Sequence, residues 1–402
     1  MSCAGIIISN CPYSVLDQIS WLCIAEDFVR SKISGDFDHS DAYFVNDGYD
    51  KQIVNVQINE LDSGQMVITD RGKLLQFLTI AEKASYKYIF LDIRFEKGQD
   101  TESDSALFAK IATMKNVLYA NHSDIYKNSY GKEFPPVKII NPNTKLPKYA
   151  YNDYYTTAFN SNFSRYAYIQ DGRTSVALRM YQDINGKSVK KEWLGYKNDG
   201  EWCENCPFVP IDRPLLIHID DSSEEKAEEE YHNLGLILLS EPEELIKHMN
   251  DKIVVVGDFN EDTHDTYMGK VQGPYLTYLA YKYLADGKNN ISIWFYFALT
   301  IVFYLIVRSK ISKQKNRAWA LIKKKISSII PKKTHSILSK IWHLLSKPWR
   351  NFLLSFVTYS LILTLISVLL YVTFGKIFNI VFPALMLTLI DKVINSLRKE
   401  QQ

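Results

Sequence analysis

Residues 252–266 read KIVVVGDFNEDTHDT, and this stretch decides the fold. The apolar, β-branched run from Ile253 to Val256 is typical of a strand buried on both faces of a sheet. Gly257 and Asp258 follow at once and end the strand. The stretch therefore predicts a buried strand that leads into a polar, acid-rich loop.

Outward from this strand, apolar runs alternate with segments of helical spacing. Residues 53–58, 86–95 and 117–120 read IVNVQI, YKYIFLDIRF and VLYA and predict further strands. Helical patterns or helix start signals mark four other segments, 71–84, 104–114, 240–249 and 273–284. This alternating order predicts an α/β domain, in which a sheet with parallel strands is covered by helices.

The middle of the chain has weaker patterns. Residues 122–210 are rich in Tyr, Asn, Lys and Gly, and they predict an insertion of loops and edge strands. The clearest strand candidates lie at 176–181 and 215–219. The acidic run at 221–232, DSSEEKAEEEYH, predicts a solvated helix face or a mobile loop.

Three apolar segments follow the domain, at 291–307, 351–374 and 377–397. A helix of about 20 apolar residues crosses the hydrocarbon core of a bilayer. The second segment meets this requirement, the first is a little short, and the third contains Pro383, Asp391 and Lys392. We expect all three to be transmembrane helices, which gives an all-α transmembrane region after the α/β domain.

The charge distribution orients these helices. Residues 1–307 hold 30 Lys+Arg against 43 Asp+Glu, whereas 308–350 hold 13 Lys+Arg and no Asp or Glu. Short loops rich in Lys and Arg stay in the cytoplasm. We therefore expect a multi-pass protein of the inner (cytoplasmic) membrane, with 308–350 inside and the large domain extracytoplasmic.

An exported domain needs a segment that starts its translocation. Residues 3–25 are apolar, but Asn10, Pro12 and Asp17 interrupt them and no basic residue precedes them. Residues 1–34 are thus either a poor first span or, as we favour, an N-terminal segment that keeps the remnant of a first membrane helix.

Residues 35–290 resemble the type-two CHASE domain, an extracytoplasmic sensory domain. The N-terminal half of the match consists of Asp70-Arg71, the string YIFLDIRF at 88–95, and Asp104. The C-terminal half consists of KIVVVGD at 252–258, DTHDT at 262–266, Gly269 and Gly273-Pro274. The family typically continues at once into three membrane helices, which is the order expected here.

The resemblance implies a membrane-anchored sensor without catalytic activity. Such a protein receives an unknown stimulus outside the cytoplasm and signals through the membrane. Family members usually carry an output domain after the last helix, which we do not expect in this chain. The signal would then pass to an unidentified signalling or envelope protein, and a homodimer is a further predicted interaction. The alternatives are an extracytoplasmic metal-dependent hydrolase and a structural envelope anchor.

The loop after the buried strand holds the candidate ligand or metal residues Asp258, Asp262, His264 and Asp265. Carboxylates and imidazoles bind divalent cations, and α/β sheets hold their sites beyond the strand ends. Asp92 joins this set if its strand is adjacent. The alternative is that these side chains cap turns and helix starts. We expect no cofactor apart from this candidate divalent cation.

The basic loop at 308–350 has a second pattern. Apolar residues that include Trp319 and Trp342 recur at helical spacing, with Lys323, Lys324 and Lys325 between them. Two basic amphipathic helices on the inner lipid surface explain this pattern, so membrane lipids are predicted partners. Docking of a partner helix is an alternative, and we expect no nucleic acid.

Two residues separate Cys203 from Cys206 in the sequence. In an oxidising compartment such a pair forms a local disulfide, and two free thiols are the alternative. A zinc site would need two further ligands, which no second CxxC supplies.

Overall fold

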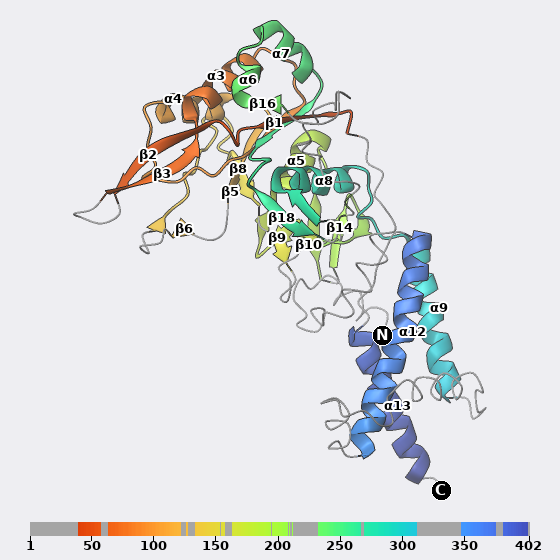
Figure 1. Cartoon of the computed structure of the whole chain (residues 1–402). Coiled ribbons are helices and arrows are strands. Elements are labelled where there is room, and N and C mark those ends of the chain that lie inside the picture. The colour runs from red at the N-terminus through yellow and green to blue at the C-terminus, as the bar shows by residue number, and fades with distance from the viewer. Residues whose placement is uncertain are drawn as a thin grey trace, which may run out of the picture.

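The computed structural model describes residues 39–57, 63–121, 126–127, 133–152, 154–156, 163–193, 195–207, 209, 211, 232–266, 269–311, 347–374 and 381–400. Its centre is a six-stranded sheet (Figure 1). The spatial order is β16 (His232–Asn233), β1 (Ala42–Asn46), β17 (Ile253–Gly257), β4 (Tyr88–Asp92), β5 (Val117–Asn121) and β8 (Tyr149–Tyr151). Every neighbouring pair in it is parallel. The α/β prediction, with parallel strands, is confirmed.

Helices cover both faces of this sheet. Along β17, Ile253 and Val255 enter one hydrophobic core while Val254 and Val256 enter the other, because successive strand residues point to opposite faces. The first core is closed by α5 (Val176–Asn185) and α8 (Gly273–Ala285). The second is closed by α3 (Arg71–Ala81), α4 (Asp104–Thr113), α6 (Leu234–Ile237) and α7 (Pro242–Met249). Figure 1 shows these two groups of helices on either side of the strands.

Small antiparallel sheets surround this body. The hairpin of β2 (Lys51–Gln57) and β3 (Ser63–Thr69) projects from it (Figure 1). The others are β6 (Tyr126–Lys127) with β7 (Glu133–Phe134), β9 (Tyr154–Thr156) with β10 (Phe163–Tyr166), β11 (Ile169–Gln170) with β12 (Arg173–Thr174), β13 (Val189–Glu192) with β14 (Gly195–Asn198) and β15 (Glu201–Cys203), and β18 (Thr263–Thr266) with β19 (Gly269–Gln272).

Two strand predictions need correction. Residues 53–58 lie largely in a strand, but that strand is β2 of the hairpin and not part of the central sheet. Residues 176–181 are helical, in α5, and the prediction of a strand was wrong. The helix begins because the Ser175 side chain accepts a hydrogen bond from the Leu178 amide. It ends at Gly186, whose φ of 68° is the left-handed conformation that glycine adopts most readily.

Three helices follow the domain, namely α9 (Ile293–Ile311), α12 (Lys347–Phe374) and α13 (Val381–Glu400). They pack against one another through an apolar core of their own, and Figure 1 shows them extending away from the sheet. The three expected helices are therefore present.

Length and composition support a membrane span for one of the three helices, α12. Among the described residues, one stretch, Trp349–Ser367 of α12, is long and apolar enough to cross a bilayer, and only 28% of it is buried. The apolar stretch of α9, Ile293–Arg308, is shorter. Spans at α9 and α13 stay predictions. Residues 1–34 and 215–219 lie outside the described part of the chain, as does 312–346 with Trp319, Lys323, Lys324, Lys325 and Trp342.

Candidate functional site

Polar residues meet where the three central strands end. The register pairs Asn46 of β1 with Gly257 of β17, and Gly257 with Asp92 of β4. Asp47 and Asp258 directly follow the first two strands. Because parallel strands all end at the same edge, these side chains come from distant parts of the sequence to one place.

The connections of the fold also reverse at this edge. After β1 the chain passes through the β2–β3 hairpin to α3, whose residues pack in one core, and after β17 it passes to α8, whose residues pack in the other. Neighbouring strands whose connections leave toward opposite faces define the point where open α/β sheets bind ligands. The carboxyl ends of β1, β17 and β4 are therefore the candidate site.

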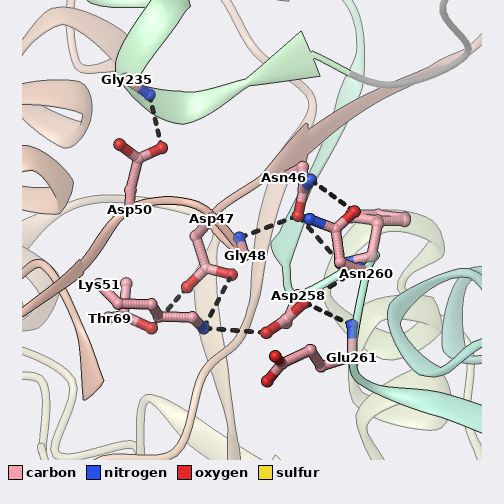
Figure 2. Close-up of polar contacts among 11 residues, drawn as sticks. Asn46, Asp47, Gly48, Asp50, Lys51, Thr69, Gly235, Asp258, Asn260 and Glu261 are labelled. Atoms are coloured by element: carbon pink, nitrogen blue, oxygen red, sulfur yellow. Dashed lines mark hydrogen bonds and ion pairs between the residues drawn. The ribbon is translucent and has the colours of Figure 1, made fainter. Parts of the chain in front are cut away.

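An ion-pair network closes one side of the site (Figure 2). Lys51 Nζ lies 3.0 Å from Asp258 Oδ2 and 3.9 Å from Asp47 Oδ1. The Thr69 hydroxyl donates to Asp47 Oδ2 at 2.5 Å. Burial raises the pKa of Asp47, against the opposing effects of Lys51 and Thr69. Lys51 is thus shared by two carboxylates, Asp47 and Asp258, so the acidic groups on this side outnumber the basic one.

Asn46 fixes the loops that carry these acids. Its Oδ1 accepts hydrogen bonds from the amides of Gly48 and Phe259, at 2.9 and 3.1 Å, and its Nδ2 donates to Asn260 Oδ1 at 3.2 Å. Asp258 Oδ1 accepts from the Asn260 and Glu261 amides at 3.0 and 2.8 Å (Figure 2). This is the turn-capping role that the sequence offered as an alternative for Asp258.

Asp50 holds the elements beside the site together. It accepts a hydrogen bond from Lys73 Nζ of α3 at 2.7 Å. It accepts a second one from the Gly235 amide of α6 at 2.7 Å (Figure 2). A Cβ atom on Gly235 would lie 2.4 Å from Asp50 Oδ1, so this approach requires glycine. Two helices of the second core are thereby tied to the segment that follows β1.

The other side of the site is built around Asp92. Its Oδ1 accepts a hydrogen bond from Asn152 Nδ2 at 3.1 Å, and its buried Oδ2 has no hydrogen-bond partner in the described part of the protein. Burial and, next, the negative charge of Asp262 raise the pKa of Asp92 well above its usual range, and Asp47 adds to the effect. This carboxyl therefore takes up a proton, or attracts another positive charge, more readily than an exposed aspartate does.

Asp262 connects the site to α8. Its backbone carbonyl accepts from the Gly273 amide at 2.8 Å, and a Cβ atom on Gly273 would lie 2.4 Å from Asp262 Oδ2. His264 Nε2 lies 3.4 Å from Asp262 Oδ1. The carboxylate of Asp262 thus lies against the first residue of α8 and beside a histidine.

The five predicted ligand residues do not form one metal centre. Asp92 and Asp262 interact, and Asp262 contacts His264, but Asp258 is paired with Lys51. Asp265 is exposed on β18, opposite Lys270 of β19. Within the described ranges, no group of three or more His, Cys, Asp or Glu side chains is placed to hold a metal ion. His264 and Asp265 diverge because neighbouring residues of β18 point to opposite faces, whereas Asp92 ends β4 and Asp258 follows β17.

The expected disulfide is not formed. Cys203 and Cys206 are both buried thiols with no bond between their sulfur atoms. Cys203 ends β15 and packs in the core beneath α5 and α8, whereas Cys206 packs against Ala167 in a separate small cluster. The two side chains enter different surroundings, and burial raises the pKa of Cys206 to about 12, which keeps this thiol protonated.

Several residues of the site are absent from the sequence-based prediction. They are Asn46, Asp47, Lys51, Thr69 and Asn152. The run AYFVN at 42–46 followed by Asp-Gly carries the same signal as the β17 segment, a short apolar strand that ends in an acid. No local signal marks Lys51, Thr69 or Asn152, because their roles depend on contacts across the fold.

Comparison of the chain with protein-family models, with curated protein sequences and with solved structures gives no match. The fold and the site define an α/β domain with a cluster of acidic side chains at the carboxyl edge of its sheet, followed by an apolar helical bundle.

Proposed function

We propose that the chain is a membrane-anchored sensor of the type-two CHASE kind. Its α/β domain lies outside the cytoplasm and binds an unknown stimulus at the carboxyl edge of the sheet, without catalysis. The signal passes through the membrane helices to a signalling or envelope protein. The excess of carboxylates over lysines at the site favours a ligand with a positively charged group.

The observation that carries the proposal is the course of α8. This helix begins at the site, where Gly273 lies against Asp262, and all but two of its thirteen residues are buried. Tyr278 and Lys282 bond to Asp41 at the other end of β1, at 2.5 and 3.3 Å. A helix held on all sides in this way moves as a unit, so a change at its first turn reaches its last turn.

The connection from α8 to α9 has little freedom. Gly287, with φ of 67°, ends α8, and the amides of Gly287 and Lys288 bond to the carbonyls of Leu284 and Tyr283 at 3.1 and 3.0 Å. This is the Schellman arrangement, which closes the last helical turn. The C-terminal end of α8 is therefore fixed relative to the residues that follow.

Those residues dock on β15 through an isolated β-bridge. Asn290 bridges Cys203 of β15 in antiparallel fashion, and the Ile291 amide donates to the Trp202 carbonyl at 2.8 Å. Asn290 Nδ2 donates to Glu201 at 2.7 Å. α9 starts at Ile293, directly after this docked segment. Fixed contacts thus connect the site to α8, α8 to the docked segment, and the docked segment to the start of α9.

The surface of the helical bundle supports a lipid environment. Large apolar side chains of α9 and α12 are exposed, namely Trp294, Phe297, Ile301, Tyr304, Leu305, Trp349, Val357, Leu361, Leu365 and Leu369. A belt of this kind is costly in water and suits hydrocarbon, with Trp and Tyr at its borders. We propose three spans and a cytoplasmic basic loop on this basis and on the charge distribution.

Cysteine labelling of the full chain in native membranes tests the topology. In a chain whose own cysteines are replaced, a single cysteine at Asp221 should react with an impermeant reagent from outside. One at Ser327 should react only after the membrane is opened. Equal accessibility at both positions would overturn the proposed orientation.

A distance measurement tests the signalling route. Spin labels at the exposed positions Tyr304 of α9 and Leu361 of α12 report the separation of these helices in lipid nanodiscs. Neutralising the site with Asp92→Asn and Asp262→Asn imitates a bound positive charge and should shift the distance distribution. The matched control, Asp265→Asn, changes an exposed carboxylate of the same hairpin and should leave it unchanged. Identical distributions in all three proteins would favour a structural envelope anchor.

A further inference from the structure

Asn152 occupies a junction between the site and the helices of the first core. It follows β8 at the carboxyl edge of the sheet and is 2% exposed. Its backbone amide donates to the Asn121 carbonyl at 2.9 Å, which continues the pairing of β8 with β5. This pairing holds the residue at a defined position at the edge of the sheet.

The side-chain amide of Asn152 joins three elements. Nδ2 donates to Asp92 Oδ1 of β4 at 3.1 Å. Oδ1 accepts from the Thr277 hydroxyl of α8 at 3.0 Å and from the Tyr166 hydroxyl of β10 at 3.2 Å. Thr277 and Tyr166 are completely buried, so these bonds are not exchanged for bonds to bulk water.

The Tyr166 bond extends the network to a second helix. The Tyr166 hydroxyl accepts a hydrogen bond from the Ala177 amide at 3.3 Å, in the first turn of α5. α5 and α8 pack in the same core. One asparagine amide thus connects a carboxylate of the site to the first turn of α5 and to the second turn of α8.

The charge on Asp92 decides the strength and direction of these bonds. A carboxylate only accepts, so it holds the amide with Nδ2 toward Asp92 and Oδ1 toward the two hydroxyls. A hydrogen bond to an ionised group is roughly twice as strong as one between neutral groups. Loss of the charge therefore weakens the bond that orients Asn152, and with it the bonds that Thr277 and Tyr166 make.

We propose that Asn152 is the positioning residue that transmits the charge state of Asp92 to α8 through Thr277, and to α5 through Tyr166. This inference rests on the proposed function and names the route by which the site acts on α8. Asp262 offers a separate contact with α8, because its carbonyl accepts a hydrogen bond from the Gly273 amide. The Thr277 hydroxyl also lies 3.3 Å from the Gly273 carbonyl, but the bond between Asp262 and Gly273 does not include Thr277, so a substitution at Thr277 still separates the two routes.

Hydrogen exchange of the full chain in nanodiscs tests the route. Asp92→Asn removes the charge with almost no change of shape. Relative to α4, which lies in the other core, the amides in the first two turns of α8 and the first turn of α5 should exchange roughly two- to tenfold faster. Thr277→Val keeps the shape of the side chain but lacks the hydrogen-bond donor. In this background, Asp92→Asn should still increase the exchange rate of the α5 amides and no longer increase that of the α8 amides.

Two outcomes would overturn the inference. If Asp92→Asn changes the exchange rates of neither α5 nor α8 relative to those of α4, Asn152 does not transmit the charge state of Asp92 to these helices. If α8 responds equally in both backgrounds, the signal takes the Asp262–Gly273 contact and the relay through Thr277 is wrong. In that second case, Asp92→Asn with Asp262→Asn should still shift the spin-label distance between α9 and α12. The proposed function then stands while this inference fails.

Discussion

Gly257 is the position where the sheet, the site and α8 approach most closely, and a single methyl group tests that packing. A Cβ atom there would lie 2.6 Å from Pro274 Cγ and 3.1 Å from Asp92 Cβ. Carbon atoms pack at about 3.5 Å or more, so Pro274 or the strand must move by roughly 1 Å. Neither neighbour is the far end of a flexible side chain, because Pro274 is a ring in the first turn of α8.

The expected cost of Gly257→Ala follows from this crowding. Overpacking a tight core site by one methyl group destabilises a protein by about 1–3 kcal/mol. In hydrogen exchange of the full chain, the β17 amides should lose protection by about five- to 150-fold, since 1.36 kcal/mol corresponds to a factor of ten. The first turn of α8 should lose protection as well, because Pro274 is the group that is displaced.

Two further variants make this test specific. Pro274→Ala removes the Cγ atom that clashes, so the double variant should recover part of the protection lost in Gly257→Ala. Gly72→Ala is the comparison variant, because a Cβ atom there would lie 3.3 Å from its nearest atom, Asp70 Oδ1, and should cost much less than one at Gly257. If Pro274→Ala gives no recovery, contact with α8 is not the cause of the effect and the proposed close coupling is wrong.

Three further predictions follow from the site and the basic loop. Thr69→Val removes a hydrogen bond to the buried Asp47 carboxylate and should lower the free energy of unfolding by about 1.5–3 kcal/mol, measured by hydrogen exchange. The folded-state pKa of Asp92 is raised, so the folded protein binds this proton more tightly than the unfolded chain. Stability should therefore fall as pH rises from the ordinary aspartate pKa of about 3.9 through the folded value. Asp92→Asn should reduce that slope in thermal melting curves recorded at several pH values, while the part that comes from the buried Asp47 persists. An unchanged slope would contradict the assignment. A synthetic peptide of residues 317–346 should be disordered in buffer and helical on anionic vesicles by circular dichroism, with binding weakened by salt. A peptide that stays disordered at low salt would favour docking on a protein partner instead.

The sequence predicts most of the central framework because local signals there agree with the fold. β17 and β4 are continuous apolar runs, as strands covered on both faces must be. Pro242 and two glutamates mark the start of α7, and Gly273-Pro274 marks the start of α8. β1 is not among the predicted strands, although its short apolar run ends in an acid as that of β17 does.

The candidate site is predictable in part. Asp92 and Asp262 are acids at or just beyond strand ends, and the register of β17 with β4 brings them together. Asp258 is equally prominent in the sequence, but it forms an ion pair with Lys51, the first residue of β2. Such a pairing depends on the order of strands in the sheet, which sequence spacing does not contain. The same reason applies to Asn152, whose three side-chain partners come from three separate elements.

The burial of α8 and the exposure of α9 suggest why the signal would travel in one direction. α8 is enclosed on nearly every side, so small displacements at its first turn are not absorbed by rotation of exposed side chains. α9 presents apolar side chains outward and has few such constraints. Packed cores respond to a local change by moving between discrete arrangements, while a helix surrounded by lipid adjusts its tilt at modest cost. A shift that begins at Gly273 therefore meets its least resistance beyond Asn290, where the docked segment gives way to α9.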